Sequence, residues 1–160
     1  MVGNNIITYP LKIAFSSYAI IGLTLVIIAS SIAVYLSGVK PKNPATKSFI
    51  LFNICIALSG VATILSNTII HWGSIFVPWQ DFWILLGGFA FSQFAYRISQ
   101  REHTKESKIV LSILAMFIFL AFVYCVVFGY RVLFNWEPSL DVSDYYYALL
   151  PIGILMVVFV

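Results

Sequence analysis

Long apolar runs separated by short polar connections dominate the sequence. A helix needs about twenty apolar residues to cross the roughly 30 Å hydrocarbon core of a bilayer. Several runs without Asp, Glu, Lys or Arg reach or approach that length. The spans that this pattern predicts lie near residues 13–38, 49–70, 79–97, 109–130 and 145–160. We therefore predict an all-α fold, a polytopic membrane helical bundle of about five transmembrane helices that forms one domain over residues 1–160.

Two of the predicted spans are short. The third is long enough if Pro78 begins the helix and if Asp81 and Arg97 lie in the two headgroup layers. The fifth reaches only about 24 Å at 1.5 Å per residue, and a carboxylate that ended in hydrocarbon would cost several kcal/mol. Either the bilayer thins around this helix, or the natural chain continues beyond Val160, which we favour.

The charged residues are distributed unevenly between the two sides of the predicted bundle. Seven of the nine basic residues lie in the connections after the first and third spans, and four of the six acidic residues lie on the opposite side. These basic residues are Lys40, Lys42, Lys47, Arg97, Arg101, Lys105 and Lys108. Short loops rich in Lys and Arg stay cytoplasmic, so we predict that the amino terminus is outside. We interpret the basic groups as headgroup anchors rather than as a specific lipid-binding site.

The tryptophans support the same orientation independently. All four lie in or beside the two connections that are predicted to be outside: Trp72, Trp79, Trp83 and Trp136. Indole rings settle at the headgroup level, where their apolar body and polar N–H are both satisfied. We therefore assign them as interface anchors.

The composition excludes a water-soluble globule and leaves few groups for chemistry. Apolar residues make up 61% of the chain and charged residues only 9%, against roughly half and a quarter in soluble domains. The two histidines, His71 and His103, are predicted on opposite membrane faces, so they cannot share a metal or a haem. Cys55 and Cys125 lie in different spans and are interpreted as small packing residues. We expect a non-catalytic protein of a bacterial or archaeal plasma membrane, with no cofactor, metal or nucleic-acid partner.

Small and polar residues form a stripe within the predicted spans. On the second span, residues at three- and four-residue steps share one helix face, and they are Asn53, Ala57, Gly60, Thr63 and Asn67. Similar positions on the first and third spans are Ala29, Ala33, Gly88, Ser92 and Gln93. One interpretation is that these faces pack together, since small residues allow close approach and amides bond across helices. The alternative is a pocket for a small or lipid-like ligand, and its candidate binding residues are Asn53, Thr63, Asn67 and Gln93.

Three segments between about residues 40 and 108 resemble a known family. They are Asn43-Pro44-Ala45-Thr46-Lys47-Ser48-Phe49, Ala57-Leu58, and Leu86-Gly87-Gly88-Phe89-Ala90-Phe91 followed by Phe94-Ala95-Tyr96 and a charged turn. This order resembles the amino-terminal, seven-span membrane input region of bacterial sensor histidine kinases. The resemblance implies an outside amino terminus, a cytoplasmic output domain as partner, and a role in signal input.

A second functional class remains open. The chain could be an accessory or structural subunit of a larger integral membrane complex, in which its apolar faces cover other integral subunits or hold lipids. The absence of ionisable residues deep in the predicted spans favours this class, because coupled carriers and proton relays usually keep such residues there. In both classes membrane lipids are expected partners.

The predicted orientation can be tested by cysteine labelling. A cysteine placed at Lys105 should be protected from impermeant thiol reagents in intact cells, because that connection is predicted to be cytoplasmic. A cysteine placed at Ser139 should be labelled. The reverse pattern would show that the orientation is inverted.

Overall fold

The computed structural model describes residues 16–40, 43–69 and 73–135, and every regular element in these ranges is helical. The helices are α1 (Ser17–Gly38), α2 (Pro44–Thr68), α3 (Val77–Ile98) and α4 (Lys105–Asn135). A short 3₁₀ helix, η1 (Gly73–Phe76), precedes α3. The predicted all-α fold is therefore confirmed for the described ranges.

Three helices are long and apolar enough to cross a membrane: α1, α2 and residues 105–127 of α4. This agrees with three of the predicted spans and with membrane integration. Helix α3 matches the predicted third span in position and has 22 residues, but Gln80, Asp81 and Arg97 lower its apolar character. The predicted fifth span at 145–160 lies outside the described residues, as do His71, Trp72 and Trp136.

Local capping determines where the first two helices begin. Asn43 caps α2, since its side-chain oxygen accepts hydrogen bonds from the Thr46 backbone N–H at 2.7 Å and from the Thr46 hydroxyl at 2.8 Å. Pro44 follows at the first helical position, where its missing N–H is not needed. The side chain of Ser16 caps α1 by accepting from Ala19 N at 3.3 Å. Because of the Asn43 cap, α2 begins five residues before the predicted start at residue 49.

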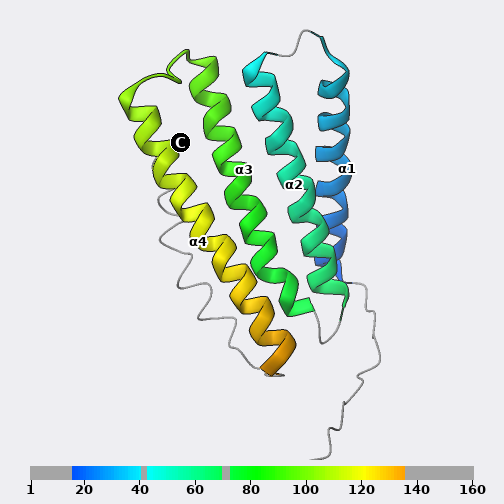
Figure 1. The fold of residues 1–160 in the computed structure, drawn as a ribbon. Coiled ribbons are helices and arrows are strands. Elements are labelled where there is room, and N and C mark those ends of the chain that lie inside the picture. The colour runs from blue at the N-terminus through cyan, green and yellow to red at the C-terminus, as the bar shows by residue number, and fades with distance from the viewer. Residues whose placement is uncertain (1–15, 41–42, 70–72, 136–160) are drawn as a thin grey trace, which may run out of the picture.

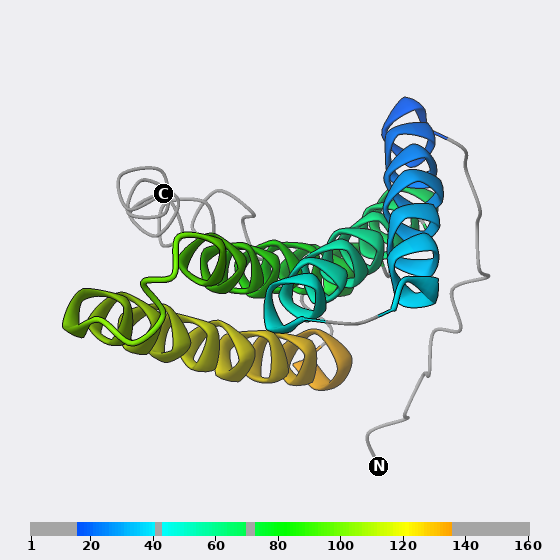
Figure 2. The same cartoon turned by 90° about the horizontal axis from the view of Figure 1, so that it is seen from above.

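The four helices form an open row in chain order. Each packs mainly on its neighbour in the sequence, so α2 and α3 lie in the middle and α1 and α4 lie at the two ends (Figures 1 and 2). Along the helix axes, the end of α1, the start of α2, the end of α3 and the start of α4 all lie at one side of the bundle, which we call the loop end (Figure 1). The central helix α2 is more buried than the two end helices: 44% of its most apolar stretch is buried, against 22% for α1 and 11% for α4.

Helices α1 and α2 approach each other at two glycines. A Cβ atom added to Gly22 would lie 2.8 Å from the carbonyl oxygen of Gly60, and one added to Gly60 would lie 2.7 Å from that of Gly22. Every buried residue of α1 is small, and they are Ala19, Gly22, Ala29 and Ala33. Small residues allow two helix backbones to approach closely, which is a main source of helix association in lipid.

Aromatic rings form the contact between α2 and α3 near the loop end. The ring centroids of Phe49 and Phe94 lie 4.7 Å apart, and those of Phe52 and Phe91 lie 5.3 Å apart. Aromatic pairs at such distances contribute about 0.5–1.5 kcal/mol beyond their burial. Deeper in the same interface, Gly87 lies against Cys55.

Helix α4 contacts α3 through a separate aromatic group at the opposite end. The rings of Trp79 and Phe82 lie 6.1 Å and 5.8 Å from the ring of Phe122. The thiol of Cys125 donates to the carbonyl oxygen of Pro78 at 3.2 Å. This contact is less extensive than the α1–α2 and α2–α3 contacts, so α4 is the more loosely held of the row's end helices.

The glycine contact predicts a specific sensitivity to a single methyl group. Gly60→Ala should lower the free energy of unfolding by about 1–3 kcal/mol, because the new Cβ meets backbone that cannot move without separating α1 from α2. Gly38→Ala is the matched control, since nothing lies within 4 Å of its Cβ position. Thermal unfolding in mild detergent measures both. Equal stability of the two variants would contradict the close contact.

Candidate functional site

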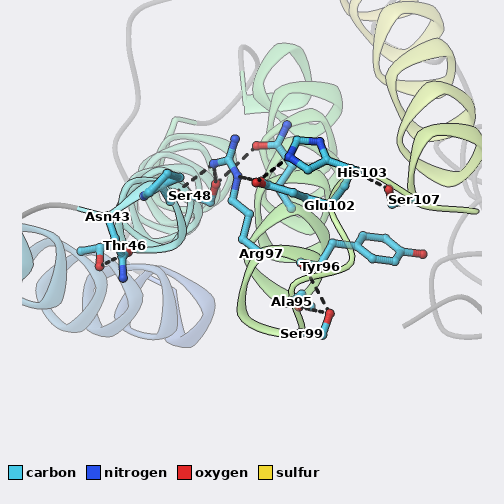
Figure 3. Close-up of polar contacts among 12 residues, drawn as sticks. Asn43, Thr46, Ser48, Ala95, Tyr96, Arg97, Ser99, Glu102, His103 and Ser107 are labelled. Atoms are coloured by element: carbon cyan, nitrogen blue, oxygen red, sulfur yellow. Dashed lines mark hydrogen bonds and ion pairs between the residues drawn. The ribbon is translucent and has the colours of Figure 1, made fainter. Parts of the chain in front are cut away.

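The main polar site of the described residues is a cluster at the loop end, centred on Arg97 (Figure 3). We call it the Arg97 cluster, and it consists of Ser48, Gln93, Arg97, Glu102 and His103. These residues come from the beginning of α2, the end of α3 and the α3–α4 connection. The antiparallel pairing of α2 with α3 brings together positions that are 49 residues apart in the chain.

Arg97 joins these three segments through one guanidinium group. Its Nη1 donates to the carbonyl oxygen of Pro44 at 2.9 Å and to the hydroxyl of Ser48. Its Nε donates to Oε2 of Glu102 at 3.2 Å, which is also an ion pair. Hydrogen bonds from a charged donor are stronger than neutral ones, and the planar fork lets one side chain reach several acceptors.

Ser48 is the buried partner of the cluster. Its residue is only 2% exposed, and its hydroxyl accepts from Arg97 while donating to Oε1 of Gln93 at 3.4 Å. A buried hydroxyl without partners would cost about 1–3 kcal/mol. Arg97 and Gln93 therefore stabilise Ser48 at this position, and the three side chains tie α2 to α3.

Glu102 contacts two basic side chains. Besides Arg97, its Oε1 lies 3.3 Å from Nε2 of His103, an interaction that is ionic only when the imidazole is protonated. The side chains of Arg97 and Glu102 are 31% and 38% exposed, so water screens their attraction. The His103 side chain is 89% exposed, which makes its pair with Glu102 weaker still.

The backbone of the α3–α4 connection holds Glu102 in place. Gln100 has a φ of 58°, and the N–H of Arg101 donates to the carbonyl oxygen of Tyr96 at 2.9 Å. This is the left-handed cap that often ends a helix. At the start of α4, the hydroxyl of the fully buried Ser107 donates to the carbonyl oxygen of Glu102 at 2.8 Å. Glu102 is therefore fixed through both its side chain and its backbone.

The polar residues of α2 that were predicted as candidate ligand-binding residues donate hydrogen bonds within their own helix. Asn53 donates to the carbonyl oxygen of Phe49 at 2.8 Å, Thr63 to that of Ser59 at 2.9 Å, and Asn67 to that of Thr63 at 2.9 Å. Asn53 and Thr63 are buried, whereas Asn67 is partly exposed. No hydrogen bond in the described part of the chain links these three side chains to Gln93.

The stripe on α2 and Gln93 belong to different interfaces. Gly60, in the middle of the stripe, lies against Gly22 of α1, whereas Gln93 contacts Ser48. At 3.6 residues per turn, Ser48 and Gly60 point about 120° apart around α2. Asn53 lies on nearly the same side as Gly60. The four nominated ligand-binding residues therefore do not converge on one place in the described structure.

The residues predicted from the sequence to pack helices or to anchor the chain at the membrane interface differ in burial. Ala29, Ala33 and Gly60 are buried, Ser92 is buried and donates to the carbonyl oxygen of Gly88 at 2.9 Å, and Ala57 and Gly88 are partly exposed. Trp79 and Trp83 lie on α3 and contact Phe82 through their rings.

Sequence reasoning missed Ser48 as a site residue and treated Arg97 as a headgroup anchor. Ser48 stands one residue before the predicted second span, and Arg97 ends the third. Two neighbouring antiparallel helices place such positions at the same depth, and this is the signal that could have paired them. Gly22 was missed because it lies alone among large apolar residues in the sequence.

Comparison with protein-family models, with curated proteins and with solved structures found no match for this chain. Among the described residues, no group of three or more His, Cys, Asp or Glu side chains could hold a metal ion. The candidate function therefore rests on the geometry of the helices and of the Arg97 cluster.

The Arg97 cluster predicts unequal effects for two arginines. Arg97→Gln should lower the free energy of unfolding by about 1–3 kcal/mol, because Ser48 and the Pro44 carbonyl lose a charged donor. Arg101→Gln is the matched control and should change it by less than about 0.5 kcal/mol, since this side chain is exposed and makes no hydrogen bond with a described residue. Arg97→Lys should restore only part of the loss. Equal effects at the two arginines, measured by thermal unfolding in detergent, would contradict this role.

The left-handed cap predicts a stabilising substitution. Gln100→Gly should raise the free energy of unfolding by about 1 kcal/mol, because glycine has no Cβ to oppose a positive φ. Gln100→Ala keeps the Cβ and should give no gain. Thermal unfolding distinguishes the two, and a gain shared by both variants would argue against the cap.

Proposed function

We propose that this protein is a non-catalytic membrane sensor, a signal-input module of a bacterial or archaeal plasma membrane. The observation that carries the proposal is that Arg97, at the end of α3, bonds to two other segments at once: the start of α2 and the α3–α4 connection. In this proposal the loop end faces the cytoplasm, the amino terminus is outside, and α3 crosses the bilayer as a further span.

The proposed mechanism is a shift of α3 relative to α2 that is transmitted to α4. Phe49, Phe52, Phe91 and Phe94 hold α2 and α3 together beside the Arg97 cluster. A displacement between these helices changes the position of Arg97 relative to Ser48, and Glu102 moves with Arg97. Packed helices have discrete alternative arrangements, so a ligand or a membrane state that favours one arrangement shifts the population.

The proposed input site is the α1–α2 interface. Asn53, Thr63 and Asn67 lie on or beside the face of α2 that meets α1, where Gly22 and Gly60 allow close approach. A small or lipid-like molecule that separates these helices would alter the packing of α2. Gln93 bonds to Ser48, so in this proposal it belongs to the Arg97 cluster and not to the ligand site.

A second candidate function is that of an accessory subunit in a larger integral membrane complex. The open row favours it, because α1 and α4 present large exposed apolar side chains that suit contact with other subunits as well as with lipids. On α1 these include Ile20, Ile27 and Ile28, and on α4 they include Met116, Phe119 and Leu120.

Two measurements test the proposed function. Purification from the native membrane in mild detergent, with intact mass and identification of bound proteins, should find a cytoplasmic output domain on the same chain or bound to it. Stoichiometric binding to other integral subunits, without such a domain, would favour the accessory subunit.

The transmission step is tested by the distance between spin labels at Lys47 and Lys108, which are exposed positions on α2 and α4. The native cysteines are buried and should label poorly. Arg97→Gln should shift or broaden the distance distribution, whereas Arg101→Gln should leave it unchanged. An unaltered distribution in the Arg97 variant would eliminate the cluster as the coupling element.

A further inference from the structure

The charge of the α3–α4 connection is more positive in the structure than its composition indicates. Three bases, Arg101, Lys105 and Lys108, alternate there with the acids Glu102 and Glu106, which by composition leaves little net charge. Glu102, however, is paired with Arg97 and His103. Its negative charge is therefore directed toward the Arg97 cluster and away from the three neighbouring bases.

The three bases remain exposed and form no ion pair with a described residue. Ser107, which lies between the two lysines in the sequence, is fully buried and bonded to the carbonyl oxygen of Glu102. This bond fixes the rotation of the first turn of α4, so that Lys105 and Lys108 face outward. The result is an outward-facing cationic surface of three side chains.

A row of exposed apolar side chains continues from this surface along α4. Below Lys105, steps of three and four residues lead to exposed positions on the same helix face, and they are Ile109, Ile113, Met116 and Leu120. The uncharged, apolar part of α4 begins at Ile109, directly after Lys108. The same face therefore carries positive charge on its first turn and exposed apolar side chains along the turns that follow.

We infer that this face of α4, with Arg101, binds anionic phospholipid in preference to zwitterionic phospholipid. A lipid phosphate or acidic headgroup neutralises the three bases, and an acyl chain lies along the apolar row. The continuity of charge with apolar surface favours a lipid over an acidic peptide or a free phosphate, which would use the charge alone. This inference replaces the sequence-based interpretation of Arg101, Lys105 and Lys108 as general headgroup anchors, and it does not depend on the proposed signalling function.

The test compares two lipids with identical acyl chains, phosphatidylglycerol and phosphatidylcholine, on the full chain purified in neutral detergent. Native mass spectrometry should show preferential retention of phosphatidylglycerol. Arg101→Gln with Lys105→Gln should reduce that preference by about fivefold for each charge removed. Glu106→Gln removes an acid from the same turn and should increase it. Added salt should weaken the preference.

Matched controls separate charge from fold and lipid from phosphate. The charge-preserving pair Arg101→Lys with Lys105→Arg should retain the preference, and circular dichroism should show unchanged helix content in all variants. Equal retention of the two lipids, or a preference that survives loss of both charges, would overturn the inference. Displacement of the lipid by millimolar inorganic phosphate would also overturn it, because the ligand would then be a free anion.

Discussion

The guanidinium of Arg97 is the interaction on which the loop end of this molecule depends. It is a permanently charged group at the end of α3 and beside the start of α2, and it donates to a carbonyl and a hydroxyl of α2 and to a carboxylate of the α3–α4 connection. Leaving such a group partly buried without acceptors would be costly. The position of α3 relative to α2 is therefore constrained by the need to satisfy this one side chain, and the α3–α4 connection is constrained through Glu102.

The remaining interfaces use contacts that need no polar partner. Helices α1 and α2 meet through the backbones of Gly22 and Gly60, and α2 and α3 meet through phenylalanine rings. In lipid, burial of apolar surface gives little advantage to helix association, so close packing and a few polar contacts carry it. The polar side chains of α2 fit this arrangement, because Asn53, Thr63 and Asn67 satisfy their donors on their own helix.

The open row gives the end helices different environments from the central ones. Helix α2 is covered on two sides, whereas α4 is held to α3 by a limited contact around Phe122 and by the connection at its first turn. An element that is fixed at few points responds most to a change at those points. This is the physical basis for placing the end of the proposed transmission step on α4, whereas the proposed lipid contact rests on the exposed charged and apolar side chains of the same helix.

The sequence alone determined the helical elements and their membrane character. Runs of apolar residues near the bilayer thickness predict helices without knowledge of packing, and Asn43 with Pro44 is a local signal for a helix start. The predicted helices are confirmed for the described ranges because helix formation depends on residues close in the chain, although the predicted start of the second helix at residue 49 missed the Asn43 cap. The glycine in the stripe, Gly60, was also visible as a small residue on a regular face.

Only the tertiary structure decided which side chains meet. Gln93 was grouped with Asn53 and Asn67 because all are polar and within spans, but the rotation of α2 places Gln93 against Ser48 and the stripe toward α1. Arg97 and Glu102 are five residues apart, yet their pairing depends on the left-handed cap at Gln100 and on Ser48 from another helix. Contacts between helices depend on their rotation and depth, and these are set by the shapes of both surfaces together, which one-dimensional periodicity does not contain.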